Sequence, residues 1–245
     1  EAAALPAWLE QLDAAGADAL ILADLGAFTL AGKYAPHCER HISTQQSIAN
    51  YVCAQSWFDL GASRVVLARE LSLREIQAVA EAAPDLDLEV FVHGALCYSY
   101  SGQCLFSALE YGKSANRGRC VYPCRAEFAV EEEDDNRGAR EDRYGLAGNC
   151  DAGRAGQRGL AGGCGGLRSH LFFMKDLALE EAVLKIPALS LKIEGRKKSP
   201  LYVAAVTNYY RHILDGRKKD LKEAEDIRQI FSRPWCRFHF NGKDK

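Results

Sequence analysis

Apolar segments of strand length alternate with helical segments along this chain, and this alternation limits the possible folds more than any other feature. The apolar runs predict buried strands at residues 18–24, 39–45, 64–70, 88–94 and 189–195. Helical spacing and capping residues predict helices at residues 5–14, 46–60, 72–84, 174–186, 199–216 and 220–232. Strands that alternate with helices of this length are typical of α/β proteins with a parallel sheet.

Polar residues stand at the end of each predicted strand. They are Asp24, Ser43, Thr44, Gln45, Arg69, Glu70, His93, Glu194 and Arg196. Side chains at the carboxyl ends of barrel strands converge on one mouth, where barrel enzymes carry out their chemistry. No glycine-rich dinucleotide fingerprint follows an early strand, so a (β/α)8 TIM-like barrel is favoured over a doubly wound sheet. Only five clear strands are visible against the eight that a closed barrel needs.

Composition excludes several classes of protein. The 245 residues are enough for one large domain or two small ones, and the net charge of −2 means that a nucleic-acid partner needs a local basic patch. No apolar run reaches the roughly 18 residues of a membrane span, and no secretory signal is visible. A cytoplasmic protein with no membrane partner is therefore predicted. The chain begins at Glu1 rather than methionine, which indicates a fragment or a processed form.

Three regions differ in composition. Residues 1–130 carry the βα repeats of a partial barrel together with a cysteine-rich segment. Residues 131–169 are an acidic run followed by glycine- and arginine-rich sequence without hydrophobic periodicity, which predicts a mobile insertion. Residues 170–245 supply the last barrel strand and the C-terminal helices of the same domain.

Four of the nine cysteines, Cys97, Cys104, Cys120 and Cys124, lie close together in the sequence. The cysteine density is too low for a disulfide scaffold, and clustered thiols in a reducing compartment indicate metal or redox chemistry. The first pair is spaced too widely for the usual structural zinc site, whereas an iron-sulfur cluster accepts ligands from irregular loops. Zinc or another divalent metal stays open as an alternative, as do cysteines with no common role.

The strand-end residues also have two interpretations. His93 is either a hydrogen-bonded structural histidine or part of a pocket. Lys192, Glu194 and Arg196 alternate along one strand, so they share a face and form either an anion-binding site or an internal network of ion pairs.

The sequence EVFVHGALCYSYSGQCLFS at residues 89–107 resembles the signature of peptidase family U32, the collagenase-like proteases. The resemblance extends through HISTQ at 41–45, RVVLARELS at 64–72, SANRGRCVYPCR at 114–125, MKDL at 174–177 and SLKIEGRKKSPLYVAAVTNYYR at 190–211. It implies a (β/α)8 barrel, of which this chain lacks the first strands. It also implies either peptide hydrolysis or oxygen-independent hydroxylation of RNA or ubiquinone with a [4Fe-4S] cluster, and the four cysteines match the cluster ligands.

Within the family, the sequences SANRG and PCR are most similar to those of the proteins that act on ribosomal RNA. The basic and aromatic residues Arg117, Arg119, Arg125, Tyr98, Tyr100 and Tyr122 then become candidates for phosphate binding and base stacking, with ordinary surface as the alternative.

These observations predict an iron-sulfur enzyme that hydroxylates a base of ribosomal or transfer RNA. The alternatives are a collagenase-like peptidase acting on a peptide, and a non-catalytic RNA-binding or scaffold subunit. Candidate catalytic residues are His93, Glu70 and Glu194. Candidate substrate-binding residues are Gln45, Arg69, Lys192, Arg196, Arg117 and Arg125. The oligomeric state is not predicted.

Overall fold

The computed structural model describes residues 2–129, 168–170, 172, 175–196, 198–217, 221–231 and 233–242. It divides into two compact units, one made of residues 1–123 and 173–245, and one made of residues 124–172. The insertion predicted at 131–169 lies outside the described residues except for its last two positions. The predicted α/β class is confirmed in the larger unit.

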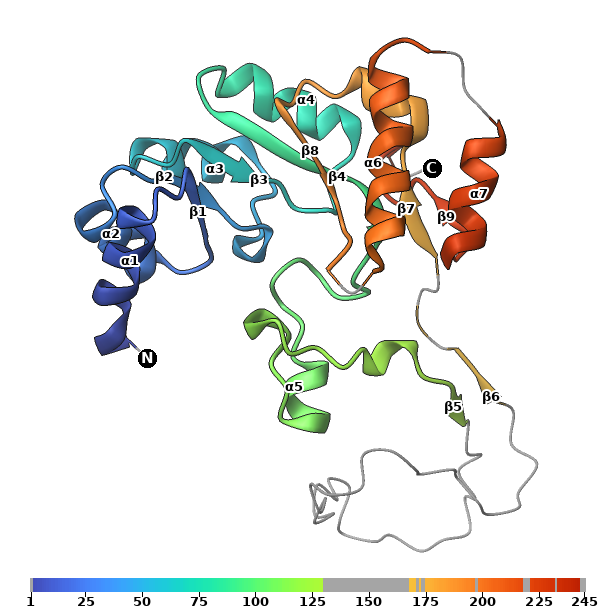
Figure 1. The fold of residues 1–245 in the computed structure, drawn as a ribbon, viewed down its shortest axis with the longest axis horizontal. Coiled ribbons are helices and arrows are strands. Elements are labelled where there is room, and N and C mark those ends of the chain that lie inside the picture. The colour runs from blue at the N-terminus through green and yellow to red at the C-terminus, as the bar shows by residue number, and fades with distance from the viewer. Residues whose placement is uncertain are drawn as a thin grey trace, which may run out of the picture. The chain divides into compact units, whose positions relative to one another are not determined.

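A sheet of seven strands forms the centre of the larger unit (Figure 1). Its strand order is β1-β2-β3-β4-β7-β9, with β8 paired to β4. Neighbours among β1, β2, β3, β4 and β8 pair in parallel, whereas β7 runs antiparallel to β4, and β9 is parallel to β7. The bounds are β1 Ala19–Leu22, β2 Glu39–Ile42, β3 Arg64–Val66, β4 Asp87–Ala95, β7 Asp176–Ala178, β8 Ser190–Ile193 and β9 Trp235–Cys236. In the smaller unit β5 (Phe128–Ala129) pairs with β6 (Arg168–Ser169).

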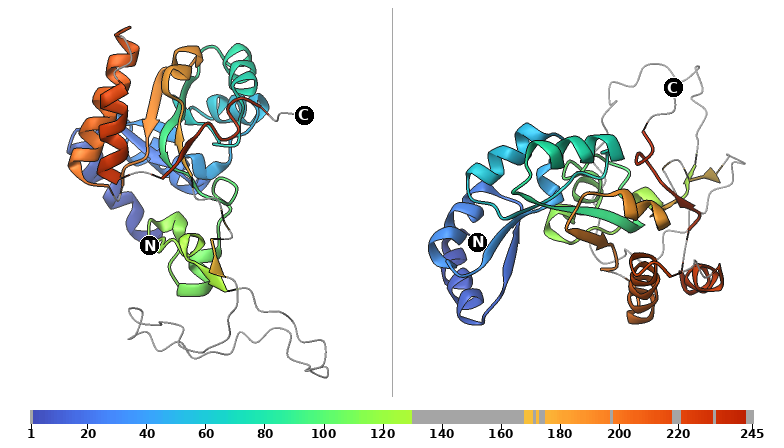
Figure 2. Two further views of the ribbon diagram at one scale, coloured as in Figure 1. Left: turned by 90° about the vertical axis from the view of Figure 1, so that its right-hand side faces the viewer. Right: turned by 90° about the horizontal axis from the view of Figure 1, so that it is seen from above.

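Helices connect the parallel strands. Their bounds are α1 Leu5–Ala14, α2 Leu25–Tyr34, α3 Tyr51–Asp59, α4 Leu73–Ala82, α5 Phe106–Tyr111, α6 Pro200–Leu214 and α7 Leu221–Phe231. Short 3-10 helices are η1 Ala2–Ala4, η2 Thr44–Gln46, η3 Ala115–Arg117, η4 Pro123–Arg125 and η5 Glu180–Lys185. Ser72 and Glu75 begin α4 with the capping box expected from the sequence, and Ser199 caps α6. Figure 2 shows α6 and α7 lying side by side.

The core of the larger unit is built from the strands and the helices that cover them. Val65, Leu67, Val92, Val206 and Tyr209 are among its fully buried members. Burial of this apolar area is the main force that holds the parallel strands and α6 together. A smaller cluster between α1 and α2 contains Leu9, Ala31, Ala35 and Cys38.

Two predicted elements were wrong in type or extent. Residues 174–186 were predicted to be one helix, but Asp176–Ala178 form β7 and pair with the end of β4, and Glu180 takes a positive φ of 50°. Pairing with β4 satisfies the backbone of this segment, and all three residues of β7 are buried, so tertiary contacts override the local helical pattern. The helix predicted from residue 46 begins only at Tyr51, because the side chain of Asn50 accepts the backbone N–H of Cys53.

Helix α2 was not predicted at all. Its apolar residues Phe28 and Ala31 are spaced for a helix, but the helix itself contains glycine at positions 26 and 32, which hides the pattern. Asp24, interpreted from the sequence as a residue of the barrel mouth, caps this helix by accepting the backbone N–H of Ala27 at 2.8 Å. Within the described residues, no helix has the length and apolar character needed to cross a membrane.

Candidate functional site

The carboxyl ends of β2, β3, β4 and β8 bring most of the predicted site residues to one edge of the sheet. Gln45 follows β2, Arg69 and Glu70 follow β3, Cys97 follows β4, and Glu194 follows β8. Because these strands pair in parallel, their carboxyl ends meet at the same edge. The chain from Cys97 to Tyr122, called here the cysteine segment, leaves the sheet at this edge.

Ser101, in the middle of the Cys97–Cys104 loop, is completely buried against the residues that follow β3. Its backbone N–H donates to a carboxylate oxygen of Glu70 at 3.0 Å, and its hydroxyl donates to the other oxygen at 2.9 Å. The same hydroxyl accepts the Nε–H of Arg69 at 3.1 Å, and the carbonyl of Ser101 accepts the hydroxyl of Ser47. Two predicted site residues, Glu70 and Arg69, therefore bind the loop that separates two cysteines.

Gly102 fixes the next position of the loop. It adopts φ +78°, and a Cβ atom at this position would overlap the backbone carbonyl of Gln45. Asn116, further along the cysteine segment, donates to the carbonyl of Gly102 at 2.9 Å, while its own carbonyl accepts the side chain of Gln45 at 3.3 Å. Gln45 thus contacts two parts of the cysteine segment.

The four predicted ligand cysteines are free thiols. Cys97 is exposed, and Cys104, Cys120 and Cys124 are partly exposed. The first three belong to the larger unit and Cys124 to the smaller one. The sulfur of Cys120 accepts the backbone N–H of Tyr122 at 3.3 Å, a contact of the kind that stabilises thiolate ligands. Among the described residues, no three His, Cys, Asp or Glu side chains are gathered as a metal-binding group.

The loop after β8 faces the last part of the cysteine segment. Nη1 of Arg196 lies 3.4 Å from the position that a Cβ on Gly118 would occupy. Burial raises the pKa of the Tyr122 hydroxyl, and so do the nearby charges of Glu194, Cys120 and Cys97, whereas Arg196 opposes them. The structure therefore brings two of the cysteines near the end of β8.

Exposed aromatic and basic side chains gather on the cysteine segment. Its exposed tyrosines are Tyr98, Tyr100, Tyr111 and Tyr122. Lys113, Arg117 and Arg119 are exposed as well. The segment contains one carboxylate, Glu110, so residues 97–122 carry a net charge of +2 while the whole chain carries −2. Arg125 belongs to the smaller unit.

Lys192 takes part in an ion pair on the sheet. Its Nζ lies 2.6 Å from a carboxylate oxygen of Glu89, and Ser190 donates to the other oxygen at 2.8 Å. Burial tends to raise the pKa of Glu89, but Lys192, Ser190 and Arg64 outweigh it and hold that pKa below the ordinary value. The sequence left open whether Lys192 binds an anion or joins an internal ion pair. The structure shows the ion pair with Glu89.

We expect Glu89→Gln to destabilise the fold by about 2 kcal/mol at neutral pH, because Lys192 loses its charged partner. Since the folded-state pKa of Glu89 is lowered, its contribution is present above pH 4.5 and disappears as the pH falls through the folded-state pKa. Urea unfolding at pH 7 and pH 3 measures the difference, with the exposed Glu110→Gln as control. An equal loss at both pH values would show that the ion pair is not the cause.

His93, on strand β4, is buried. Its Nδ1 lies 3.2 Å from the hydroxyl of Tyr210, and its ring packs edge-on against Tyr210 and Trp235. The hydroxyl of Tyr210 in turn donates to the carbonyl of Val92 at 2.9 Å. Of the two interpretations from the sequence, the structure shows the hydrogen-bonded structural histidine.

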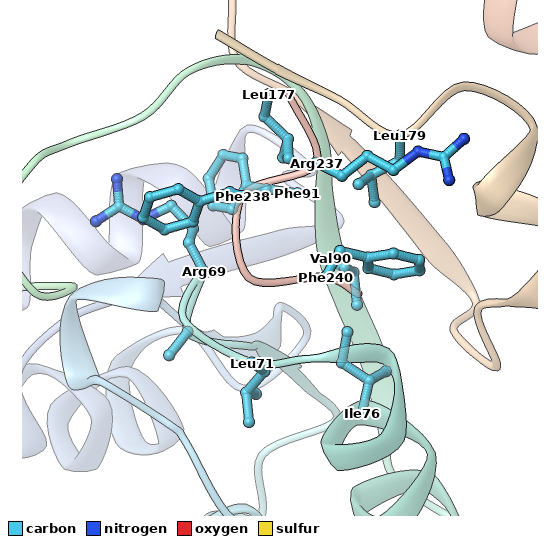
Figure 3. A pocket seen from close by; sticks show the side chains of 11 residues that line it. Arg69, Leu71, Ile76, Val90, Phe91, Leu177, Leu179, Arg237, Phe238 and Phe240 are labelled. Atoms are coloured by element: carbon cyan, nitrogen blue, oxygen red, sulfur yellow. The ribbon is translucent and has the colours of Figure 1, made fainter. Parts of the chain in front are cut away.

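A small cavity lies between β4, the start of α4 and the C-terminal loop, as Figure 3 shows. It has a volume of about 20 Å³, and its wall includes Val90, Leu177, Phe238 and Phe240. This is room for about one water molecule, and the wall is mostly apolar. The cavity is therefore too small for a nucleoside or a peptide.

Sequence reasoning missed the residues that hold the cysteine segment in place. Ser101, Gly102, Asn116 and Ser47 could not be singled out, because each acts through a hydrogen bond or close contact with a residue distant in sequence. The one available signal was the glycine between two cysteines, since a glycine in a loop often marks a positive φ or a close approach of two backbones.

Comparison with known proteins shows that the chain belongs to peptidase family U32, which it matches over residues 1–245. It is 40% identical over 202 residues to tRNA hydroxylation protein P of Helicobacter pylori, a match of 81% of this chain and 44% of the relative. It is 37% identical over 204 residues to the 23S rRNA 5-hydroxycytidine C2501 synthase of Escherichia coli, covering 82% of this chain and 26% of the relative.

A further relative is named a collagenase, from Porphyromonas gingivalis, and is 28% identical over 211 residues, covering 81% of this chain and 44% of the relative. The chain thus spans about half the length, or less, of these curated relatives. No solved structure matches the chain. The identities to the tRNA and rRNA proteins are comparable, so the ribosomal branch favoured by the sequence stays a prediction.

Proposed function

We propose that this chain is part of an enzyme that hydroxylates RNA. Its cysteine segment forms part of the active site. The observation that carries the proposal is the identity of 37–40% to relatives named for hydroxylation of tRNA and of 23S rRNA. The collagenase relative shares less identity, at 28%. The substrate class is RNA, and the choice between tRNA and rRNA is left to experiment.

The donor chemistry of the cysteine segment supports an iron-sulfur cluster as cofactor. Cys97, Cys104, Cys120 and Cys124 are free thiols with exposed or partly exposed side chains, and thiolates are the ligands that such clusters use. The N–H of Tyr122 already points at the sulfur of Cys120. When bound, a [4Fe-4S] cluster supplies one-electron redox chemistry. Zinc also binds thiolates, but it has no redox chemistry.

The remaining side chains suit RNA better than peptide. The cysteine segment has a net charge of +2, which favours phosphate, and its exposed tyrosines offer flat faces on which unpaired bases stack. Arg117 and Arg196 are exposed and well placed to contact phosphate. Arg125, in the smaller unit, stays a predicted substrate-binding residue.

We further propose that the parallel strands β1, β2, β3, β4 and β8 are part of a (β/α)8 barrel. Two observations support this: parallel pairing runs continuously through these strands, and their carboxyl ends gather the polar site residues. Among the described strands, β1 pairs only with β2. The other edge of β1 can therefore accept a further strand.

Mass spectrometry of nucleosides tests the function. Transfer RNA and ribosomal RNA are purified separately from cells with the gene and from cells in which it is deleted. We expect a hydroxylated nucleoside to disappear from one of the two RNA pools in the deletion strain. Unchanged nucleosides in both pools, together with hydrolysis of a collagen-like peptide by the purified protein, would instead support the peptidase.

A further inference from the structure

The loop between Cys97 and Cys104 is held to the sheet at two consecutive residues. At Ser101, Glu70 accepts both the backbone N–H and the hydroxyl, while Arg69 donates to that hydroxyl. At Gly102, the backbone lies directly on the backbone of Gln45, so that no side chain fits between them. Glu70 and Gln45 belong to the segments that follow the parallel strands β3 and β2.

The contacts at Ser101 are strong for their type. Ser101 is fully buried, so neither its hydroxyl nor its N–H exchanges these partners for water at no cost. Hydrogen bonds to a carboxylate and from a guanidinium are charge-assisted and about twice as strong as neutral ones. Both carboxylate oxygens of Glu70 accept hydrogen bonds from Ser101.

The second contact is reinforced from the far end of the cysteine segment. Asn116, which precedes Cys120, donates to the carbonyl of Gly102 and receives the side chain of Gln45 on its own carbonyl. Gln45 therefore links the Cys97–Cys104 loop to the stretch that leads to Cys120. One polar residue of η2, the 3-10 helix that follows β2, contacts both parts.

We propose that Ser101 and Gly102, with Glu70 and Gln45, are positioning residues that hold the backbone carrying Cys97, Cys104 and Cys120 in place before any cofactor binds. This inference rests on the proposed function for the identity of the cofactor, but the fixed loop exists without it. Glu70 and Gln45, candidates for catalysis and substrate binding from the sequence, are thereby assigned a different role. Mutation of a residue that orients a metal ligand through a hydrogen bond or contact usually lowers metal affinity about 10–100-fold.

Gly102→Ala is the sharpest test, because the chain offers a matched control. Gly112 also has a positive φ, of 61°, but no atom lies within 4 Å of the Cβ that alanine would add. Gly112→Ala therefore carries the same kind of backbone strain without the overlap with Gln45. Ser101→Ala, compared with Ser99→Ala in the same loop, is a milder pair in case Gly102→Ala fails to fold.

The first measurement needs no cofactor. Hydrogen exchange of residues 97–104 and alkylation of Cys97 and Cys104 are followed in the metal-free protein. We expect Gly102→Ala and Ser101→Ala to speed both by about tenfold or more relative to their controls. Equal rates in each variant and its control would overturn the inference.

The second measurement is iron and sulfide per chain after anaerobic reconstitution, followed by the rate of iron loss to a chelator. We expect about tenfold faster loss from Gly102→Ala than from Gly112→Ala. Equal loss rates in this pair would contradict the positioning role. If the wild type binds no iron, the proposal of an iron-sulfur cluster is wrong. The exchange and alkylation rates still decide whether the Cys97–Cys104 loop is held in place.

Discussion

Cys120→Ser is expected to remove nearly all iron and sulfide from the anaerobically purified protein. Cys120 is one of the four proposed ligands, and its sulfur already accepts a backbone N–H from Tyr122. A serine hydroxyl is a far poorer ligand for iron than a thiolate. The wild type should be brown and absorb near 400 nm, as thiolate-bound iron-sulfur clusters do, and the variant should be colourless.

Cys53→Ala is the matched control for this experiment. Cys53 is also a free thiol, but it lies on α3 against the core, where burial raises its pKa. The control should keep full iron content, with a small loss of stability from the missing sulfur atom. Iron retained by Cys120→Ser at the level of Cys53→Ala would show that the cluster, if present, uses other ligands.

The second large effect concerns the stability of the fold in acid. Burial lowers the pKa of His93 from 6.5 to about 4, and Lys198 acts in the same direction, whereas Asp176 and Glu180 oppose it. The folded state therefore holds His93 neutral, while the unfolded chain binds a proton below pH 6.5. This difference corresponds to about 3 kcal/mol of stability, present above pH 6.5 and lost as the pH falls through 4.

His93→Asn should remove this part of the acid dependence. Asparagine does not titrate and places a polar atom near the Nδ1 that contacts Tyr210, although the ring contacts with Trp235 are lost. The free energy of unfolding, measured in urea from pH 7 to pH 4, should be lower for the variant at pH 7 but should fall less steeply. His239→Asn, at a partly exposed histidine, serves as control. The same slope in His93→Asn as in the wild type would mean that another group causes the acid sensitivity.

Much of the α/β architecture could be predicted from local patterns. The strand at Arg64–Val66 and the capped helix at Leu73–Ala82 both carry their signals within a few residues. By contrast, β7 could not be predicted, because its extended form depends on pairing with the end of β4, about eighty residues earlier in the chain. Helix α2 was missed because glycines interrupt its apolar pattern.

The sequence predicted which residues lie at the candidate site, but not the role of each one. The positions of Gln45, Arg69 and Glu70 follow from the parallel strands, and the structure brings all three to the cysteine segment. Their contacts with Ser101 and Gly102 could not be foreseen, since these depend on how the Cys97–Cys104 loop folds back on the sheet. His93 and Lys192 needed the structure to show which partner each side chain takes.

Complementation of a deletion strain tests the proposal that this protein hydroxylates RNA through its cysteine segment. The strain is supplied with the wild-type gene, with Cys120→Ser, or with Cys53→Ala, and nucleosides from purified tRNA and rRNA are measured by mass spectrometry. We expect the wild type and Cys53→Ala to restore the hydroxylated nucleoside, and Cys120→Ser to fail to restore it. Full restoration by Cys120→Ser at equal protein level would contradict the proposal.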